Sequence, residues 1–457
     1  MPKSKKRVVV IGAGVAGLAS AIRLQHAGYE VELYEKEALP GGKMNRIDMD
    51  GYQFDLGPSI VMMPELYREV FELTGRDPDD YIPMQKIDPM YSTYFGAKAE
   101  ERYDISSDLV ELMKTLENIS EEDSKGFLNY LQEIYQRYLV AKNHFLQRPF
   151  RNFTDFYNPN TIRQMLKLKT FDSADHFIGK YVKNERIKQI LSFQTLYIGV
   201  SPYNGPSLYT IIPMIEMLYG VWFIKGGMYT MASSMERLFK ELGGKVYYNA
   251  SVDEVLIKDQ QAYGIRVKGK EVLSDFVMCN ADFPYAMKNL VKDTKSKGKY
   301  TDKKIDSMKY SCSCFVMYLG MDRKYDELDN VHNFFITEEL EKNLTDIFDG
   351  NKLEQPSFYV YVGSKLDPSL APEGKDGLYI LVPVPELSSS KYEWTDETVQ
   401  YYRKKVMDSL KNVKGLENIE EEIVSETYMT PLDFESKFNA YNGACFGLQP
   451  TLTQSNH

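Results

Sequence analysis

A glycine-rich turn near the N-terminus and an acid that follows it are the first residues in the sequence that could do chemistry. Gly12-Ala13-Gly14-Val15-Ala16-Gly17 has the spacing G-x-G-x-x-G, and Glu35 lies 18 residues beyond Gly17. The three glycines permit a tight turn, the approach of a pyrophosphate to the main chain, and close packing of a helix on a strand. The helix N-terminus then supplies N–H donors for phosphate. A carboxylate at Glu35 would accept hydrogen bonds from a ribose and repel a 2′-phosphate, which leaves NAD or FAD as the ligand.

A second glycine pair follows the acid. Gly41-Gly42 begins six residues after Glu35, and Lys43 comes next. Taken alone, Pro40-Gly41-Gly42 is an ordinary turn. Beside a dinucleotide turn it has a use, because glycines let a longer dinucleotide approach the backbone and a lysine offsets phosphate charge. The pair therefore favours FAD over NAD.

Two strands and one helix must position these residues. The β-branched run 8–11 predicts a strand, residues 18–27 have helical composition without a breaker until Gly28, and 31–34 predicts a second strand. Strand, glycine turn, helix, strand and acid then follow in the order of a Rossmann-like βαβ unit. The sequence predicts an α/β protein that begins with a dinucleotide-binding domain.

The first forty residues also resemble a known family. The run "GAGVAGLASAIRLQHAGYEVELYEKEALPGGK" resembles the signature of the flavoprotein amine-oxidase superfamily, which is G-x-G-x-x-G-L, A-x-x-L, G, V-x-V-x-E and G-G-R. Lys43 stands in place of the usual arginine, so the charge is kept and the bidentate fork is lost. Further stretches such as "DGYQFDLGPSIVMM", "CNADFP" and "FGLQPTLTQSN" are similar to the bacterial carotenoid (phytoene-type) desaturases, from residue 6 to residue 456.

The resemblance implies FAD as the cofactor and assigns contacts to it. The phosphate turn would be Gly12, Gly14 and Gly17 with Ala13, Val15 and Ala16 between them, and Glu35 would hold the ribose. Gly41, Gly42 and Lys43 would make a second phosphate contact. Gly57-Pro58 would lie beside the flavin, and Val252 would meet the adenine through its backbone.

The resemblance also implies a domain plan. It is a Rossmann-like FAD-binding domain interleaved with an α/β substrate domain and a helical, membrane-facing subdomain. The expected segments are a first FAD-binding segment (1–85), a first strand segment of the substrate sheet (86–106), the helical subdomain (107–224), a second FAD-binding segment (225–285), the main substrate sheet (286–430) and the start of a C-terminal FAD segment (431–457).

The implied reaction is the FAD-dependent desaturation of a C30 carotenoid precursor, a long hydrocarbon isoprenoid. The cofactor takes the hydride, so the sequence need not show a catalytic constellation, and none is assigned. The five histidines have no metal-binding spacing, and no metal is expected. The apolar stretch 205–224 is either a core helix or the lining of a hydrocarbon tunnel, and we favour the tunnel. Pro213 and Glu216 exclude it as a membrane span.

Charge and composition restrict the partners. The net charge of −10 and the absence of a nucleic-acid motif argue against nucleic acid. The four cysteines have neither disulfide nor zinc spacing. Residues 137–188 carry eleven Lys or Arg and four Asp or Glu, which is either a solvated helical face or a surface for anionic lipid. A hydrocarbon substrate must be drawn from the bilayer, so we expect peripheral association with the cytoplasmic side of a membrane.

Two alternatives remain open, and the C-terminus bears on one of them. A carotenoid oxidase of the same fold would yield an oxygenated product, and a non-catalytic isoprenoid-binding protein would hold lipid without flavin. The chain ends at "GLQPTLTQSNH", whereas the family continues for about fifty residues into a helix whose N-terminus stabilises charge on the flavin ring. We therefore expect this chain to lack that contact. The sequence does not indicate the oligomeric state.

Overall fold

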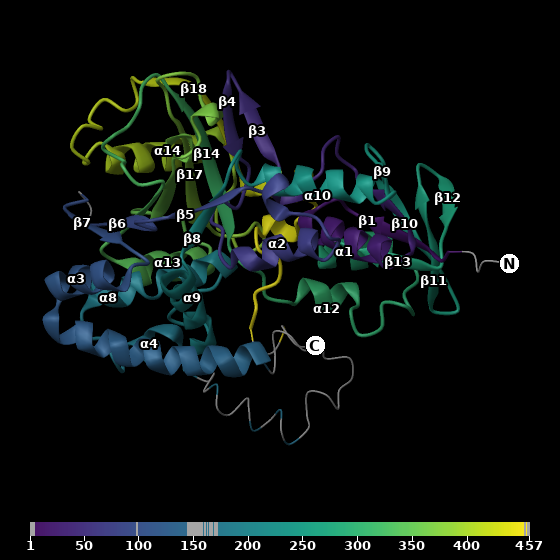
Figure 1. The fold of residues 1–457 in the computed structure, drawn as a ribbon, viewed down its shortest axis with the longest axis horizontal. Helices are drawn as coiled ribbons and strands as arrows, with labels where there is room; N and C mark the ends of the chain where they lie inside the picture. The colour runs from purple at the N-terminus through teal and green to yellow at the C-terminus, as the bar shows by residue number, and fades with distance from the viewer. Residues whose placement is uncertain are drawn as a thin grey trace.

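The computed structural model describes residues 5–96, 99–143 and 172–451, with 159, 161, 163, 168 and 454. Two large sheets organise the molecule, and Figure 1 shows them at opposite ends with a helical layer beneath one of them. The chain crosses between the two ends several times. Each end is therefore built from segments that are distant in the sequence.

The first sheet is the predicted nucleotide-type sheet. It has four parallel strands in the order β13-β1-β2-β9, with bounds Phe276–Cys279, Arg7–Ile11, Glu30–Tyr34 and Lys245–Tyr247. Helix α1 (Val15–His26) crosses over from β1 to β2, and Gly28 follows it with φ of 95°. The predicted strand–turn–helix–strand order is confirmed. Helix α10 (Tyr229–Glu241) packs against α1 in the same apolar core.

The segment after residue 245 contributes strands to two different sheets. Only β9 and β13 join the parallel sheet. The strands between them form a separate antiparallel sheet, β10-β11-β12, with bounds Val252–Lys258, Gln261–Val267 and Lys270–Leu273. Short hairpin turns join these three strands, so they pair with each other before they can reach the parallel sheet.

The second large sheet has seven strands in the order β18-β14-β17-β16-β15-β6-β7. Their bounds are Ile423–Met429, Ser313–Met321, Gly377–Val384, Phe358–Tyr361, His332–Ile336, Tyr91–Phe95 and Glu101–Ile105. The apolar runs "CFVMYLGM", "SFYVYVGS" and "LYILVPVP" overlap β14, β16 and β17, and helix α14 (Asp396–Leu410) follows them in the chain. Two small pairs, β3–β4 (Arg46–Met49, Tyr52–Asp55) and β5–β8 (Met84–Ile87, Val221–Ile224), connect the ends.

Helices α3 (Leu109–Ile119), α4 (Glu121–Ala141), α8 (Glu185–Ile190) and α9 (Ile211–Tyr219) lie below the seven-stranded sheet (Figure 1). The other α-helices in the part of the chain that the structure describes are α2 (Pro64–Glu72), α7 (Ala174–Ile178), α11 (Phe283–Tyr285), α12 (Asp302–Asp306), α13 (Leu340–Phe348) and α15 (Pro431–Phe438). Among the described residues, no helix is both long enough and apolar enough to span a bilayer.

Within the basic stretch 137–188, the residues that the structure describes are largely engaged in ion pairs. Arg137 is 4% exposed and bonds Glu133, while Arg186 bonds Glu101 and Glu338. Lys180 pairs with Asp172 and Lys188 with Asp175. Counting charges along the sequence therefore overstates the positive charge that these residues present to a partner. Most of 144–171 lies outside the described residues.

Candidate functional site

The glycine turn joins β1 to α1 in a geometry that side chains would prevent. Gly12 has φ of 93°, in the region that favours glycine, and its N–H donates to the Tyr34 carbonyl at 2.8 Å. A Cβ on Gly17 would lie 2.1 Å from the Gly12 carbonyl oxygen. Helix α1 therefore starts directly against the turn. The first-turn N–H groups of Val15 and Ala16 have no acceptor within the helix, and both residues line a cavity.

Glu35 is held rigidly at the end of β2. Its Oε2 accepts a hydrogen bond from the Ala13 N–H at 2.7 Å, and its Oε1 accepts one from the Glu37 N–H at 2.9 Å. The residue is only 7% exposed, yet it lines the same cavity as the glycine turn. Each carboxylate oxygen has a further lone pair. Glu35 can therefore accept hydrogen bonds from a sugar while it orders the turn.

The second glycine pair packs on the first turn. The Gly41 N–H donates to the Ala13 carbonyl at 2.8 Å, and Gly41 and Gly42 have φ of 112° and 55°. Lys43 lines the cavity, but its Nζ also donates to the Cys445 carbonyl at 2.5 Å. The lysine is thus already anchored to the C-terminal segment. Its contact with a phosphate stays a prediction.

One cavity of about 390 Å³ brings together most of the residues singled out in the sequence. Its lining includes Gly12, Gly14, Val15, Ala16, Glu35, Gly41, Gly42, Lys43 and Val252. Ala13 and Gly17 lie behind this wall, where Ala13 bonds both Glu35 and Gly41. The lining therefore offers amide donors and a cation for the phosphates of a dinucleotide, and a carboxylate for its ribose. The residues present therefore fit a bound FAD.

Sequence reasoning missed several residues of this cavity. Asn280, Ala281 and Asp282 line it after β13, and Lys437 and Asn439 line it from the end of α15. The amide of Asn280 lies 3.0 Å from where a Cβ on Gly14 or Gly17 would be. The motif "CNADFP" is the sequence signal nearest to Asn280, which directly follows β13, the strand that pairs with β1 beside the glycine turn. Nothing in the pattern of 437–439 indicates a ligand contact.

A second, mostly apolar cavity of about 270 Å³ adjoins the first. Gly57 and Pro58 line this second cavity and not the first, beside aromatic residues that include Phe193, Phe334 and Tyr359. A Cβ on Gly57 would lie 2.6 Å from the Lys43 carbonyl oxygen, so Gly57 in the second lining packs closely on Lys43 in the first. The lining includes Cys312 and Cys314, and none of the four cysteines is in a disulfide.

The prediction that residues 205–224 line a hydrocarbon tunnel is wrong for this cavity. Its described walls come from 57–62, from the 3₁₀ turn η4 (Phe193–Ile198), from strands of the seven-stranded sheet and from Phe446. Helix α9, which contains most of the apolar stretch, instead buries Ile211, Met214 and Met217 in the core. Residue hydrophobicity alone does not distinguish a core helix from a cavity wall.

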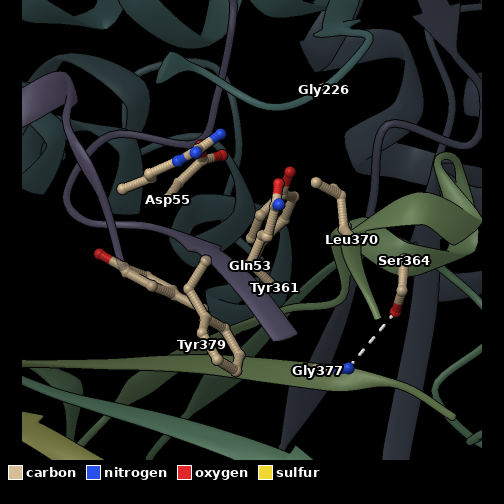
Figure 2. Close-up of a pocket in the computed structure, with 11 residues that line it drawn as sticks. Gln53, Asp55, Gly226, Tyr361, Ser364, Leu370, Gly377 and Tyr379 are labelled. Atoms are coloured by element: carbon tan, nitrogen blue, oxygen red, sulfur yellow. Dashed lines mark hydrogen bonds between the residues drawn. The ribbon is translucent and has the colours of Figure 1, made fainter. Parts of the chain in front are cut away.

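Asp55 fixes the loop that carries Gly57 and Pro58. Its Oδ1 accepts a hydrogen bond from the Met228 N–H at 2.7 Å, at the start of α10. Figure 2 shows Asp55 and Tyr361 at a small cavity of about 20 Å³, near the bond from Gly377 N–H to Ser364. Burial raises the pKa of Asp55 to about 7, and the hydrogen bond from the Met228 amide and the nearby Tyr361 side chain oppose the shift. The carboxyl therefore titrates near neutral pH.

We expect Asp55→Asn to remove a pH dependence of stability. A carboxyl whose folded pKa is raised stabilises the fold at low pH, and that contribution is lost as pH rises from the unfolded value toward about 7. The full change is on the order of 4 kcal/mol. The difference in unfolding free energy between wild type and variant, measured in urea at pH 5 and pH 8, should shift in favour of the variant at pH 8. Parallel pH curves would contradict a titrating Asp55.

With this geometry in place, comparison with known proteins defines the class. Residues 15–457 match the family described as flavin containing amine oxidoreductase. The chain belongs to this family of flavin-dependent oxidoreductases.

Particular relatives narrow the class further. The chain is 44% identical over 453 residues to a 4,4′-diapophytoene desaturase (4,4′-diaponeurosporene-forming) of Staphylococcus haemolyticus, covering 98% of this chain and 90% of that protein. It is 43% identical to the protein of the same name from Staphylococcus aureus, covering 99% and 90%. Among solved structures, a putrescine oxidase triple mutant matches with a TM-score of 0.63 at 14% identity, covering 97% and 87%, which concerns the fold alone.

Proposed function

We propose that this chain binds FAD and desaturates a C30 carotenoid precursor, converting 4,4′-diapophytoene into 4,4′-diaponeurosporene. The observation that carries the proposal is an aromatic-lined apolar cavity that adjoins a dinucleotide cavity across the backbone of Lys43 and Gly57. A hydrocarbon in the apolar cavity would then lie beside the flavin end of the cofactor. The high identity to desaturases over nearly the whole chain supports the same reaction.

The protein's own residues bind and orient in this reaction. Glu35 and the amides of the glycine turn would hold the ribose and phosphates, and Gly57 and Pro58 would border the ring. FAD supplies the hydride-accepting chemistry when bound. The apolar wall excludes water and aligns one C–H bond of the substrate for transfer. Aromatic faces such as those of Phe193 and Phe334 suit positive charge that develops on the polyene as hydride leaves.

Product analysis tests the proposal against the oxidase alternative. The purified chain would be supplied with FAD and with 4,4′-diapophytoene in liposomes, and the extracted products would be examined by mass spectrometry and visible absorbance. Desaturation predicts products lighter by two hydrogens per step, with absorbance at longer wavelength. A product heavier by oxygen would identify an oxidase. Bound lipid with no bound flavin and no product would identify a non-catalytic carrier.

We also propose that the helical layer rests on a membrane surface. Leu128, Tyr135 and Leu139 are exposed on α4, and their spacing places them on one face of the helix. Tyr219, at the end of α9, is also exposed, and its ring centroid lies 6.3 Å from that of Tyr138 on α4. Burial is worth about 0.8 kcal/mol per CH₂, so a C30 hydrocarbon must enter from the bilayer and not through water.

Replacing Leu128, Tyr135 and Leu139 together with serine should weaken binding to liposomes. Each of these exposed side chains would contribute roughly 1 kcal/mol on insertion into the membrane, so binding should fall about 100-fold. Flotation with liposomes of neutral and anionic lipid measures it. Leu273→Ser with Val424→Ser is a matched control, because these exposed residues lie on β12 and β18, away from the helical layer (Figure 1). Equal loss in the control would refute a specific role for α4.

A further inference from the structure

A buried polar cluster lies inside the otherwise apolar helical layer. It consists of Glu216 on α9, Gln194 and Tyr197 on η4, and Tyr91 on β6. Glu216 is 0% exposed, and its Oε2 accepts a hydrogen bond from Gln194 Nε2 at 3.1 Å. The same Nε2 lies 3.0 Å from the Tyr91 hydroxyl. Among the residues that the structure describes, Glu216 Oε1, Gln194 Oε1 and the Tyr197 hydroxyl have no hydrogen-bond partner.

The cluster backs directly onto the apolar cavity. Tyr197 lines that cavity together with Phe193 and Phe334. The ring of Tyr91 lies with its centroid 5.6 Å from Phe193 and 5.3 Å from Phe334, edge to face. One layer of aromatic side chains therefore separates the Glu216 carboxyl from the space assigned to the substrate. Tyr197 belongs to both the cluster and the wall.

A structural role does not account for this carboxyl. Its neighbours along the buried face of α9, such as Met214, Ile215 and Met217, are apolar. Burying a carboxyl among them is unfavourable by several kcal/mol unless its oxygens are paired. Here one oxygen has no partner among the described residues. Buried groups with unmet hydrogen-bonding capacity beside a cavity are characteristic of sites that move protons.

The surroundings of Glu216 set its protonation. Burial raises the pKa of Glu216 to about 8, while the neighbouring side chains of Gln194, Tyr197 and Tyr91 oppose the rise. Helix α4, which also packs on α9, presents Tyr130, whose hydroxyl bonds the Thr210 carbonyl, and Arg137, which bonds Ser207 and Glu133. In the described residues, no Lys, Arg, Asp or Glu contributes to the shift of Glu216. The carboxyl is therefore neutral below pH 8 and becomes a base above it.

We propose that Glu216, acting through the Tyr197 hydroxyl, accepts the proton that leaves the substrate during desaturation. The proposal rests on the proposed function and adds to it the destination of the second hydrogen. Glu216 is a positioning and proton-holding residue in this scheme, because Tyr197 alone meets the substrate cavity.

The step balances in atoms and electrons. One C–H bond of the substrate breaks with both electrons, and bound FAD in its oxidised form would accept them as hydride. The neighbouring C–H bond then breaks, its electron pair forms the new C=C bond, and its proton passes to the Tyr197 oxygen. The hydroxyl proton of Tyr197 passes in turn to the Glu216 carboxylate. The carboxyl later returns this proton to solvent and is ready for the next turnover.

We call the transfer of the proton from the substrate through Tyr197 to Glu216 the relay. Glu216→Gln and Tyr197→Phe test it in the whole flavin-loaded chain. Both substitutions keep the size of the side chain, and general acid–base groups contribute about 100-fold to 10,000-fold. We expect each variant to retain flavin absorbance and to lose at least about 100-fold in the desaturation rate. The wild-type rate should rise as pH passes through about 8. The rate of Glu216→Gln should be independent of pH in this range.

A second readout does not depend on turnover. Because the folded pKa of Glu216 is raised, wild-type stability should fall as pH rises from about 4.5 to about 8, and Glu216→Gln should lack this fall. Glu111→Gln, an exposed glutamate on α3, is the control and should match wild type throughout.

The outcomes separate the relay from the proposed function. An active wild type with an equally active Glu216→Gln variant would overturn the relay and leave the desaturase proposal intact. A slow variant that keeps the wild-type pH profile would also overturn it, since the loss would then be structural. A flavin-loaded wild type that gives no dehydrogenated product at any pH would overturn the proposed function, and the relay with it.

Discussion

The Gly17→Ala protein should purify without flavin. The added Cβ would lie 2.1 Å from the Gly12 carbonyl oxygen, which is backbone and cannot rotate away. Helix α1 would have to move off β1, and the first-turn amides would move with it. Overpacking of this kind destabilises by about 1–3 kcal/mol and also displaces the phosphate donors. We therefore expect FAD affinity to fall by at least about 100-fold.

Flavin absorbance after desalting in the presence of added FAD measures this effect. Gly179→Ala is a matched control, because its added Cβ meets nothing closer than 3.3 Å. It should retain the full flavin content. A Gly17→Ala protein that keeps its flavin would show that the turn is not where the phosphates bind.

The second large effect is expected from Glu35→Ala. The substitution removes the acceptor for the Ala13 and Glu37 amides and the acceptor proposed for the ribose. Loss of a charge-assisted hydrogen bond to a ligand costs about 1–3 kcal/mol, so the dissociation constant for FAD should rise about 5-fold to 150-fold.

Fluorescence titration of the apoprotein with FAD would give that constant. Glu30→Ala, on the same strand but at the surface end, should leave it unchanged. An unchanged constant for Glu35→Ala itself would contradict the assignment of Glu35 to the ribose. Circular dichroism would show whether the loss comes from a rearranged turn or from the missing contact.

The nucleotide-binding half of the site can be predicted from the sequence because the residues that form it are close together in the chain. Gly12, Gly17 and Glu35 lie within one βαβ unit, and the handedness of that unit brings them together. Asn280 and Asn439 reach the same cavity from distant segments, and only the fold places them there. The order of strands in the parallel sheet, with β13 and β9 at its edges, is likewise a property of long-range pairing.

The substrate side of the site is harder to predict, because the hydrophobicity of a residue does not reveal whether its side chain faces the core or a cavity. The apolar stretch that contains α9 is core, and the cavity wall instead comes from η4 and the strands. Arg137 contributes to the basic stretch in the sequence, yet its guanidinium lies 3.8 Å from the centre of the Phe177 ring and is buried. In the sequence, Glu216 serves only to exclude a membrane span. Its unsatisfied oxygen and its closeness to the cavity wall appear only in three dimensions, among the residues that the structure describes.

Flavin-dependent desaturation by this chain is tested most directly by anaerobic single turnover. The FAD-loaded protein would be mixed with 4,4′-diapophytoene in liposomes without oxygen, and flavin and carotenoid absorbance would be followed together. Transfer of hydride from the hydrocarbon predicts bleaching of the oxidised flavin in step with the appearance of a more conjugated product, with one double bond formed per flavin reduced. Flavin that stays oxidised beside bound, unchanged substrate would contradict the proposed function.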